Sequence, residues 1–458
     1  MDPSEKNQQI FETWSVPRAL RAMILPAILS QIIHVVYNLA DTWFVGLTGD
    51  PNTVAAISLC MPIYNVLTGL SNLFGVGGAS VIARFLGTHD SDRAKQSFAV
   101  AVWGASLVSC VYALLLLLMA RPLLLCIGAD SGSVDYSYVY LLVTVILGGW
   151  PTVLTATLSN LIRAVGESKK AAEGITLGAV LNIALDPLFM FVLLPKGNEV
   201  LGAALATALS NAVSLLYFAV FMSRNQNPVF SVRPGLLRRS GRILRQIVSC
   251  GMAGFCLVAL AMISNCFLNS MIGELGSGAA VAGLGIVRKI DSLAYAVNQG
   301  ITQGMLPLVA YCFASDRRGR MRSVILLSAA CTLLFSLASS TISFLFAPTL
   351  VRLFIRNAET IRYGASFLRV LCLAIPVYSI TFVIIAVFQA AGRSVEPVVL
   401  SVLHKGSLDI VLLFLFRQMF GLASIVWAAP VMEVVTLFVG IVMFARFRTA
   451  QAAKNASV

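Results

Sequence analysis

Twelve long apolar segments separated by short polar loops constrain this chain more than any other feature of its sequence. They cover residues 20–46, 54–83, 96–119, 136–160, 171–194, 201–222, 244–272, 278–312, 323–346, 363–390, 395–416 and 420–445. Stretches such as 111–119 are apolar at consecutive positions, which favours helices over the alternating strands of a membrane barrel. Since a helix needs about 20 residues to cross a bilayer, the sequence predicts an all-α polytopic membrane protein with twelve transmembrane helices.

The composition excludes most other classes of protein. Of the 458 residues, 58% are hydrophobic and 12% are charged, whereas a soluble domain has about 25% charged residues. No loop is long enough for a soluble catalytic domain, and the sequence contains no GxxxxGKS/T nucleotide-binding loop and no GxSxG or HExxH motif. We therefore expect no enzymatic activity and no cofactor, and we expect any transport to be driven by an ion gradient.

Basic residues are distributed unevenly between the loops, and this distribution sets the orientation. The net charge is +13, and 23 of the 33 Lys and Arg residues lie in one set of loops and helix ends, against 6 in the opposite loops and 4 inside the apolar segments. Because cytoplasmic loops of membrane proteins are enriched in Lys and Arg, both termini are predicted to be cytoplasmic. The positive charge is thereby explained without a nucleic-acid partner.

The sequence also divides into two similar halves. The longest loop, 223–243, is polar and basic, and it separates six segments in 1–222 from six segments and a short cytoplasmic tail in 244–458. Gly166 and Gly392 each follow the fourth segment of their half. Six spans per repeat give both halves the same orientation. We therefore expect two six-helix bundles related by a pseudo-twofold axis along the membrane normal, with a cavity between them.

Polar residues inside the first apolar segment are candidates for a functional site, because a charge at the bilayer centre costs at least about 2.5 kcal/mol. At about 100° per residue, one face of this helix holds Gln31, His34, Asn38 and Asp41, and Tyr37 lies in the same stretch. This face must point away from lipid. A hydrogen-bonded contact between helices, or a position of Asp41 near the wet outer surface, would explain the pattern as well.

A second group of polar residues lies in the fifth and sixth segments. Asn182 and Asp186 are four residues apart and share a helical face, and Pro187 frees the carbonyl of Ile183. The sixth segment adds three oxygen-bearing side chains: Thr207, Ser210 and Asn211. Such carboxylate, amide, hydroxyl and carbonyl oxygens suit Na⁺. Buried carboxyls equally suit a bound proton.

The second half holds fewer acids inside its segments. Its candidates are Asp291 in the eighth segment, Lys405 and Asp409 in the eleventh, and Glu433 in the twelfth. We interpret Lys405 and Asp409 as an ion pair within one helix, and Glu433 either faces the cavity or bonds to a neighbouring helix. The GVGGAS stretch at 75–80 lies inside an apolar segment, where small residues indicate close helix packing rather than nucleotide binding.

Four stretches give the chain a resemblance to a known family. They are LPAILSQIIHVVYNLADTWFVG at 25–46, GGASVIARFLG at 77–87, LIRAVGESKKA at 161–171, and LNIALDPLFMFVL followed by LGAALATALSN within 181–211. Together with the twelve segments and the basic central loop, they make the whole chain resemble the multidrug and toxic compound extrusion (MATE) family. Its DinF-like bacterial and archaeal branch is the most similar.

This resemblance implies a V-shaped pair of six-helix bundles in a prokaryotic cell (inner) membrane. In the DinF-like branch the ion site lies in the N-terminal bundle, and the family's cation-coupling residues match Asp41, Asn182, Asp186 and Thr207. Gln31 and Tyr37 match further family positions, and Pro26 matches a proline associated with bending of the first helix. The other major branch uses acids of the seventh and eighth helices. This chain has Asp291 on the eighth, whereas the seventh offers only Ser264, Asn265 and Asn269 at mid-depth.

We therefore expect a secondary active antiporter that exports amphipathic, mostly cationic drugs or toxins in exchange for protons, or for sodium, and that works as a monomer in the lipid bilayer. Met, Phe and Tyr side chains are expected to line a largely apolar cavity. No metal ion is expected apart from Na⁺ at the coupling residues. The first alternative is a flippase for a lipid-linked precursor, against which the scarcity of basic residues inside the spans argues. The second is a non-transporting receptor or scaffold, against which the repeat and the buried acids argue.

Overall fold

The computed structural model describes residues 9–49, 51–127, 132–238, 240–275, 278–420 and 422–456, and these form helices and no strand. The first half contains α2 (Val16–Leu47), α3 (Pro51–Gly87), α4 (Ser91–Ile127), α5 (Val134–Leu141), η1 (Leu142–Leu147), α6 (Gly149–Ala164), α7 (Ser168–Pro187), η2 (Leu188–Leu193) and α8 (Glu199–Arg224). After η3 (Pro234–Leu237), the second half contains α9 (Gly241–Leu275), α10 (Gly278–Ala314), α11 (Arg318–Leu345), α12 (Ala347–Arg352), α13 (Ala358–Leu371), α14 (Ala374–Ala390), α15 (Val395–Lys405), α16 (Ser407–Phe420), α17 (Leu422–Ile425) and α18 (Ala428–Ala456).

The long helices correspond to the predicted apolar segments. Within the described residues, nine helical stretches are individually long and apolar enough to cross a membrane. Two bent pairs each pass as one span: Val134–Leu147 with Gly149–Ala164, bent by 48°, and Ala358–Leu371 with Ala374–Ala390, bent by 43°. The remaining predicted segment, 278–312, forms the 37-residue helix α10. The prediction of an all-α polytopic membrane protein is confirmed.

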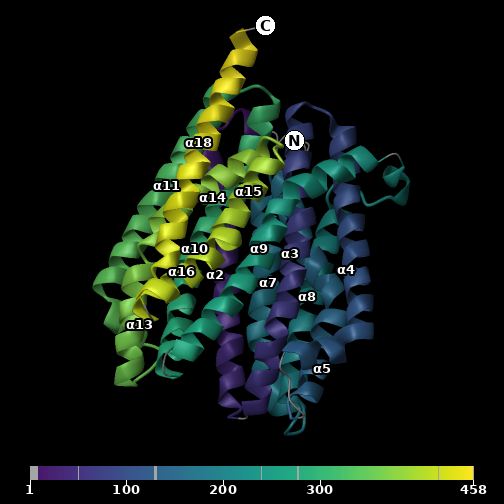
Figure 1. Cartoon of the computed structure of the whole chain (residues 1–458). Helices are drawn as coiled ribbons and strands as arrows, with labels where there is room; N and C mark the ends of the chain where they lie inside the picture. Colours follow the sequence, from purple (N-terminus) through teal and green to yellow (C-terminus); the bar gives the residue numbers. More distant parts are fainter. Residues whose placement is uncertain are drawn as a thin grey trace.

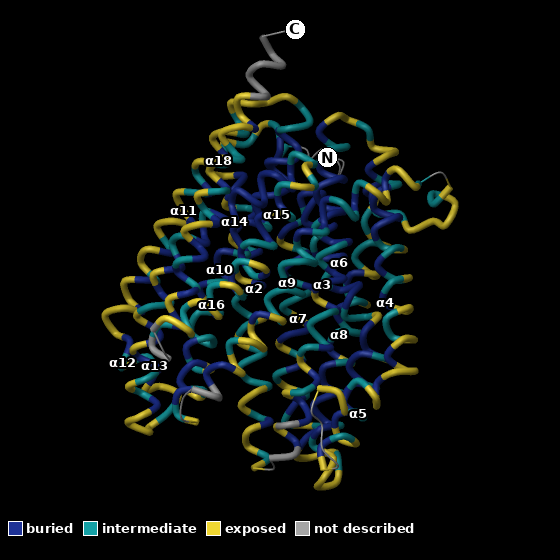
Figure 2. Tube along the Cα trace, in the orientation of Figure 1, coloured by how far each residue is buried: buried dark blue, intermediate teal, exposed yellow. Residues whose placement is uncertain are grey.

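Large apolar side chains cover the outer faces of the helices, which form the yellow rim in Figure 2. On α4, for example, Leu107 is 66% exposed and Leu118 is 71% exposed. A monomeric soluble protein rarely exposes so much continuous apolar surface. In a bilayer these side chains contact lipid. The apolar character of the outer surface is therefore explained by the hydrocarbon interior of the membrane.

The two halves meet through matched helix pairs (Figure 1). The first long helix of each half packs against the second long helix of the other half, α2 against α10 and α9 against α3. The bent spans are the fourth of their halves, and the glycines that follow them, Gly166 and Gly392, both have positive φ (101° and 72°). Glycine adopts this backbone conformation without a steric penalty. The internal repeat is therefore visible in the fold, and the domain boundary at 223–243 stays a prediction.

Close backbone contacts join the halves at one level of the molecule. A Cβ atom at Gly77 of α3 would lie 2.1 Å from a carbonyl oxygen of α9, and one at Gly251 of α9 would lie 1.8 Å from a carbonyl oxygen of α3. In the matching pair, a Cβ atom at Gly300 of α10 would lie 2.5 Å from the Cα of Ile28 in α2. The prediction that the small residues of 75–80 serve close helix packing is confirmed at Gly77.

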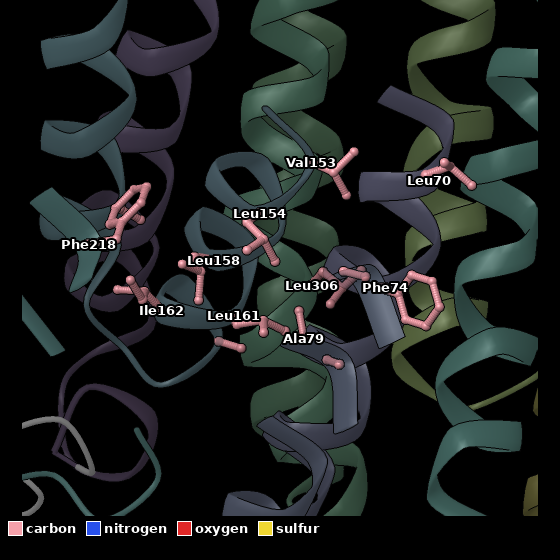
Figure 3. Close-up of a cluster of buried hydrophobic side chains, with 14 of the residues drawn as sticks. Leu70, Phe74, Ala79, Val153, Leu154, Leu158, Leu161, Ile162, Phe218 and Leu306 are labelled. Carbon is pink, nitrogen blue, oxygen red and sulfur yellow. The ribbon is translucent and has the colours of Figure 1, made fainter. Parts of the chain in front are cut away.

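One hydrophobic core continues through this level from the first half into the second. It includes Phe74 of α3, Leu158 and Leu161 of α6, and Leu306 of α10, which are all buried (Figure 3). The halves are thus packed together near the end of the molecule where α2 begins and α18 ends (Figure 1). Any cavity between them must lie further toward the opposite end.

Two predicted segments differ from the structure. The eleventh is broken between α15 and α16, because Gly406 has backbone angles of φ −118° and ψ −109°, far from helical values. Lys405 and Asp409 therefore do not share one continuous helical face, and the predicted ion pair between them is wrong. The twelfth long helix begins at Ala428 rather than at 420. Pro430 explains this start, because proline is tolerated in the first turn of a helix and not in its interior.

Candidate functional site

A cavity of about 690 Å³ lies between the two halves. The polar face predicted for the first helix points into it, since its lining includes Gln31, His34, Tyr37, Asn38 and Asp41. Within this face the rings of His34 and Tyr37 make an edge contact at 4.9 Å, and the Asn38 side chain donates to the backbone oxygen of His34 at 2.8 Å. The face is thus shielded from lipid by the arrangement of the two halves.

The remaining lining is mixed in character. It includes the adaptable apolar and aromatic types that we expected, among them Met61, Met262, Tyr295 and Phe382. It also includes seven charged side chains, four acidic and three basic: Asp41, Asp291, Asp409, Glu433, Arg163, Arg288 and Lys405. A cationic compound would therefore find both apolar contact and carboxylates in the same space.

Asn182, Asp186 and Thr207 form a buried cluster in the first half. Asp186 is 0% exposed, and the Asn182 side-chain nitrogen lies 3.4 Å from Asp186 Oδ1 and 3.5 Å from Thr207 Oγ1 as a donor to both. Asn182 Oδ1 and Asp186 Oδ2 are buried and accept no hydrogen bond. Leaving such an acceptor unsatisfied costs about 1–3 kcal/mol. These two oxygens are therefore positioned to accept a proton or to contact a cation.

The backbone next to Asp186 is irregular for a reason that the sequence contains. Helix α7 ends at Pro187, and the chain continues as the π-helical turn η2. Proline has no N–H group and its ring crowds the preceding turn, so regular α-helical bonding cannot continue. Wider turns of this kind occur frequently at functional sites.

Asp41 is the second acid of this cluster. It lines the cavity together with Tyr37, Tyr64 and Tyr140 and with Asn182, whose side chain bonds to Asp186. The tertiary structure thus brings together two carboxyls that are separated by most of the first half.

Sequence reasoning missed Tyr64 and Tyr140. Tyr64 lines the cavity together with Tyr37, Thr152 and Asn211, and Asn211 donates to the backbone oxygen of Thr207 at 3.0 Å. A buried tyrosine hydroxyl normally needs a polar partner, so each tyrosine within an apolar segment was a possible signal. The sequence does not show which of them face the same cavity.

Gln31 lies outside the Asp41 cluster and joins the two halves instead. Its side-chain nitrogen donates to Gln303 Oε1 of α10 at 3.0 Å, and the same oxygen accepts from Arg163 of α6 at 3.0 Å. Arg163 is 2% exposed and also donates to Asn160 at 3.0 Å. The sequence predicts that Arg163 belongs to the cytoplasmic basic residues, but it is buried between the halves because α6 continues to Ala164. These residues tie α2, α6 and α10 together beside the glycine contacts.

The second-half candidates lie in one wall of the cavity. Asp291 accepts a hydrogen bond from the Tyr378 hydroxyl at 3.4 Å. Asp409 accepts from the hydroxyl of Ser264 on α9 rather than pairing with Lys405. Glu433 both lines the cavity and contacts a neighbouring helix, since its Oε1 lies 2.8 Å from Nδ1 of His404. Within the described residues, no group of three or more His, Cys, Asp and Glu side chains is arranged to hold a metal ion.

Comparisons with known proteins agree with this geometry. A family model described as MatE matches residues 26–188 and 254–415. The multidrug export protein MepA of Staphylococcus saprophyticus is 27% identical over 432 residues, which is 94% of each chain. MepA of Staphylococcus haemolyticus is 25% identical over 456 residues, which is 99% of each chain.

Solved structures show the same fold. A crystal structure of MATE in complex with MaL6 aligns with a TM-score of 0.90 and 24% identity, covering 98% of this chain and 99% of that one. An outward-facing multidrug resistance MATE family transporter of the MOP superfamily aligns with a TM-score of 0.89 and 24% identity, covering 98% of both chains. The arrangement of two six-helix halves around a central cavity is therefore an established architecture.

Proposed function

Because the chain belongs to the MatE family, we propose that it is a multidrug efflux antiporter that exports amphipathic, mostly cationic compounds across a prokaryotic cell membrane in exchange for protons. The relatives described as multidrug export proteins support the cargo. The observation that carries the proposal is the joint position of two features. A cavity wide enough for a drug-sized molecule is lined by one acid, Asp41, and adjoins a second, buried acid, Asp186, in the first half.

The charges of the cavity favour this cargo over a lipid-linked pyrophosphate. A flippase for such a precursor needs a basic cavity to hold the anionic head group, because phosphate is recognised by Arg and Lys. Here four acidic side chains face three basic ones. Arg163, which is buried between the halves, is already bonded to Gln303 and Asn160.

The close contacts of α3 with α9 at Gly77 and Gly251 support a mechanism of alternating access. With both termini in the cytoplasm, the packed level around Gly77 and Gly251 closes the cytoplasmic side, and the cavity opens outward. In the proposed cycle, protons from outside bind to Asp41 and Asp186 in this state. Neutralising the two acids removes their mutual repulsion and adds a hydrogen-bond donor to the cluster. Drug release outward is then coupled to proton entry.

The test of the proposed function is transport into proteoliposomes with imposed gradients. A fluorescent cation such as ethidium should accumulate when the interior, facing the outer side of the protein, is acidic. A sodium gradient at constant pH should not support accumulation. Accumulation without any gradient, or equal accumulation with protein-free liposomes, would reject the antiport proposal.

The identity of the coupling ion can be tested at Asn182 and Thr207. Replacing either residue with Ala removes a side-chain oxygen while leaving both carboxyls in place. A Na⁺ site needs about six oxygen ligands at fixed distances, so under sodium coupling each variant should raise the sodium requirement many-fold. Under proton coupling we expect only a modest loss of transport. Accumulation measured over a series of sodium concentrations at a fixed pH gradient distinguishes the two, and collapse in sodium-free buffer would replace protons by sodium.

Pro26 is proposed to let the first long helix bend during the cycle. Helix α2 runs through Pro26 as one helix in this state, although the proline leaves the carbonyl of Ala22 without its helical donor. A helix with such a defect has two shapes of similar energy. Pro26→Ala should restore the bond and favour the straight helix, so that equilibrium drug binding is retained while turnover falls. Equal losses of binding and turnover would mean that Pro26 only shapes the cavity.

A further inference from the structure

A buried histidine–glutamate pair lies in the second-half wall of the cavity, away from the Asp41 cluster. Nδ1 of His404, near the end of α15, is 2.8 Å from Oε1 and 2.9 Å from Oε2 of Glu433 on α18. Both side chains are only 2% exposed. Ionisable residues inside membrane spans are costly, and where they occur they usually serve ion or substrate pathways.

The pair leaves one ring nitrogen free to accept a proton. An ionised carboxylate only accepts hydrogen bonds, so contact with Glu433 places the hydrogen of a neutral imidazole on Nδ1. The lone pair then lies on Nε2, and this atom is buried without a hydrogen-bond partner. His404 also lines the cavity, and the ring of Phe382 makes an edge contact with it at 5.2 Å. A proton arriving from the cavity would therefore bind at Nε2.

The charged neighbours of the pair lie mostly on the same wall. Helices α9, α14, α16 and α18 pack against α15. The charged side chains that line the cavity on the second-half side are Lys405, Asp291, Arg288 and Asp409, and Tyr378 and Tyr295 line it there as well. At this level α9 contributes the uncharged Ser264 and Asn265 to the lining. Asp291 accepts a hydrogen bond from Tyr378, Asp409 accepts one from Ser264, and Arg288 donates to Asn269 at 2.9 Å.

With its three acids ionised, protonation of His404 balances the charges of this wall. Asp291, Asp409 and Glu433 supply three negative charges, and Arg288 and Lys405 supply two positive ones. The wall is therefore negative by one charge while the imidazole is neutral, and it is neutral once the imidazole takes up a proton. An unbalanced charge away from water is costly. Imidazole is also the side chain whose ordinary titration lies between pH 5 and 8.

We propose that His404 and Glu433 form a second proton-binding site, distinct from the Asp41–Asp186 cluster, and that an organic cation bound in the cavity competes with this proton. The proposal rests on the proposed export function. With His404 neutral, the wall carries the negative charge that holds a cation. When one proton binds at Nε2, a His404 imidazolium stands against the Glu433 carboxylate and the wall loses its net charge. One cation then leaves for each proton taken up here, and no other bond changes.

The proton can be observed directly, because the chain contains only three histidines. We propose NMR of the histidine-labelled protein in nanodiscs between pH 5 and 9. Variants His34→Gln and His89→Gln, which both lie in the first half, assign the third signal to His404 without altering the pair. The His404 signal should move between the neutral and charged forms within this range, and the Glu433→Gln variant should shift its midpoint. A His404 signal that stays in one form from pH 5 to 9 would overturn the proposal.

Competition with a cation is tested by equilibrium binding of tetraphenylphosphonium in the Asp41→Asn/Asp186→Asn double variant. Binding should weaken severalfold from pH 8 to pH 5.5, and adding His404→Gln should remove this dependence. The matched control is Ser336→Ala, which removes a buried hydrogen bond to Asn298 in the same half but no titratable group, and it should leave the dependence intact. An unchanged pH dependence in the His404→Gln background would refute the second site.

These measurements separate the second site from the proposed function. They report proton binding and equilibrium binding, and they need no uphill transport. If wild-type protein fails to concentrate ethidium while the His404 signal still titrates and tetraphenylphosphonium still competes, the antiport proposal fails and the second site stands. If transport succeeds but neither readout responds at His404, the antiport proposal stands and the second site fails.

Discussion

Proteoliposomes that contain the Asp186→Asn variant should accumulate no drug above its equilibrium level, whatever pH gradient is imposed. Asparagine keeps the size and polarity of the side chain, and it can still bond to Asn182, but it cannot bind and release a proton. Asp186 is 0% exposed, so bulk water does not reach this position and cannot replace the carboxyl as the group that carries the proton. Asp41→Asn should give the same result, and the double variant should be no worse than either single one, since residues that act as one unit are not additive.

The control for this prediction is another acid-to-amide change in the same half. Asp135 is 72% exposed and pairs with Arg121 at 3.0 Å outside the cavity, so Asp135→Asn should transport at the wild-type rate. Downhill exchange of labelled drug should persist in the Asp186→Asn variant, because the cavity is unchanged. Uphill accumulation by that variant at the wild-type rate would show that Asp186 is not the coupling group.

The second large effect is expected at the glycines that close the cavity. In the Gly77→Val variant, the new side chain would begin 2.1 Å from the carbonyl oxygen of Ile247, so α3 and α9 must separate. Overpacking typically costs about 1–3 kcal/mol, which shifts a two-state equilibrium by about 5- to 150-fold. We expect the contact between α3 and α9 to be lost in most molecules. The transport rate should fall by about 5- to 150-fold. Gly251→Val should behave in the same way from the opposite helix.

Separation of α3 from α9 at Gly77 can be measured through the reactivity of a native cysteine, Cys250. Cys250 is 1% exposed, and its Sγ lies 3.5 Å from the Arg84 guanidinium of α3. A membrane-impermeant maleimide should therefore label Cys250 slowly in the wild type and much faster in Gly77→Val, as measured by mass spectrometry of the Cys250 peptide. The control is Gly285→Val, because a Cβ atom at Gly285 meets nothing within 4 Å. Unchanged labelling and transport in Gly77→Val would mean that this contact does not close the transporter.

Most of the fold was predictable because it depends on local properties of the chain. Each predicted segment is apolar over a length that crosses a bilayer, and the same residues form the long helices and bent pairs of the structure. The pairing of Asn182 with Asp186 follows from their spacing of four residues, and the irregular turn after Asp186 follows from Pro187. The prediction of one continuous helix for the eleventh segment failed at Gly406, because the backbone there leaves the helical conformation.

The partners of the polar side chains were harder to predict, because most of them lie on different helices. Gln31 was grouped with Asp41 by its helical face, yet it bonds to Gln303, which is far away in the sequence. Asp409 was paired with its neighbour Lys405, yet it accepts a hydrogen bond from Ser264. Which side chains meet depends on how each helix is rotated and how deeply it sits against its neighbours, and no single helix contains that information.

The sequence by itself therefore determined the apolar spans, the two-fold repetition and the polar faces, since these follow from the transfer free energy of each side chain and from helical periodicity. Only the tertiary structure decided that Asp41 and Asn182 line the same cavity, that His404 contacts Glu433, and that Arg163 is buried between the halves. The physical reason is packing. Glycines such as Gly77 and Gly251 let the helix backbones approach closely, and that approach fixes which polar faces meet at the cavity.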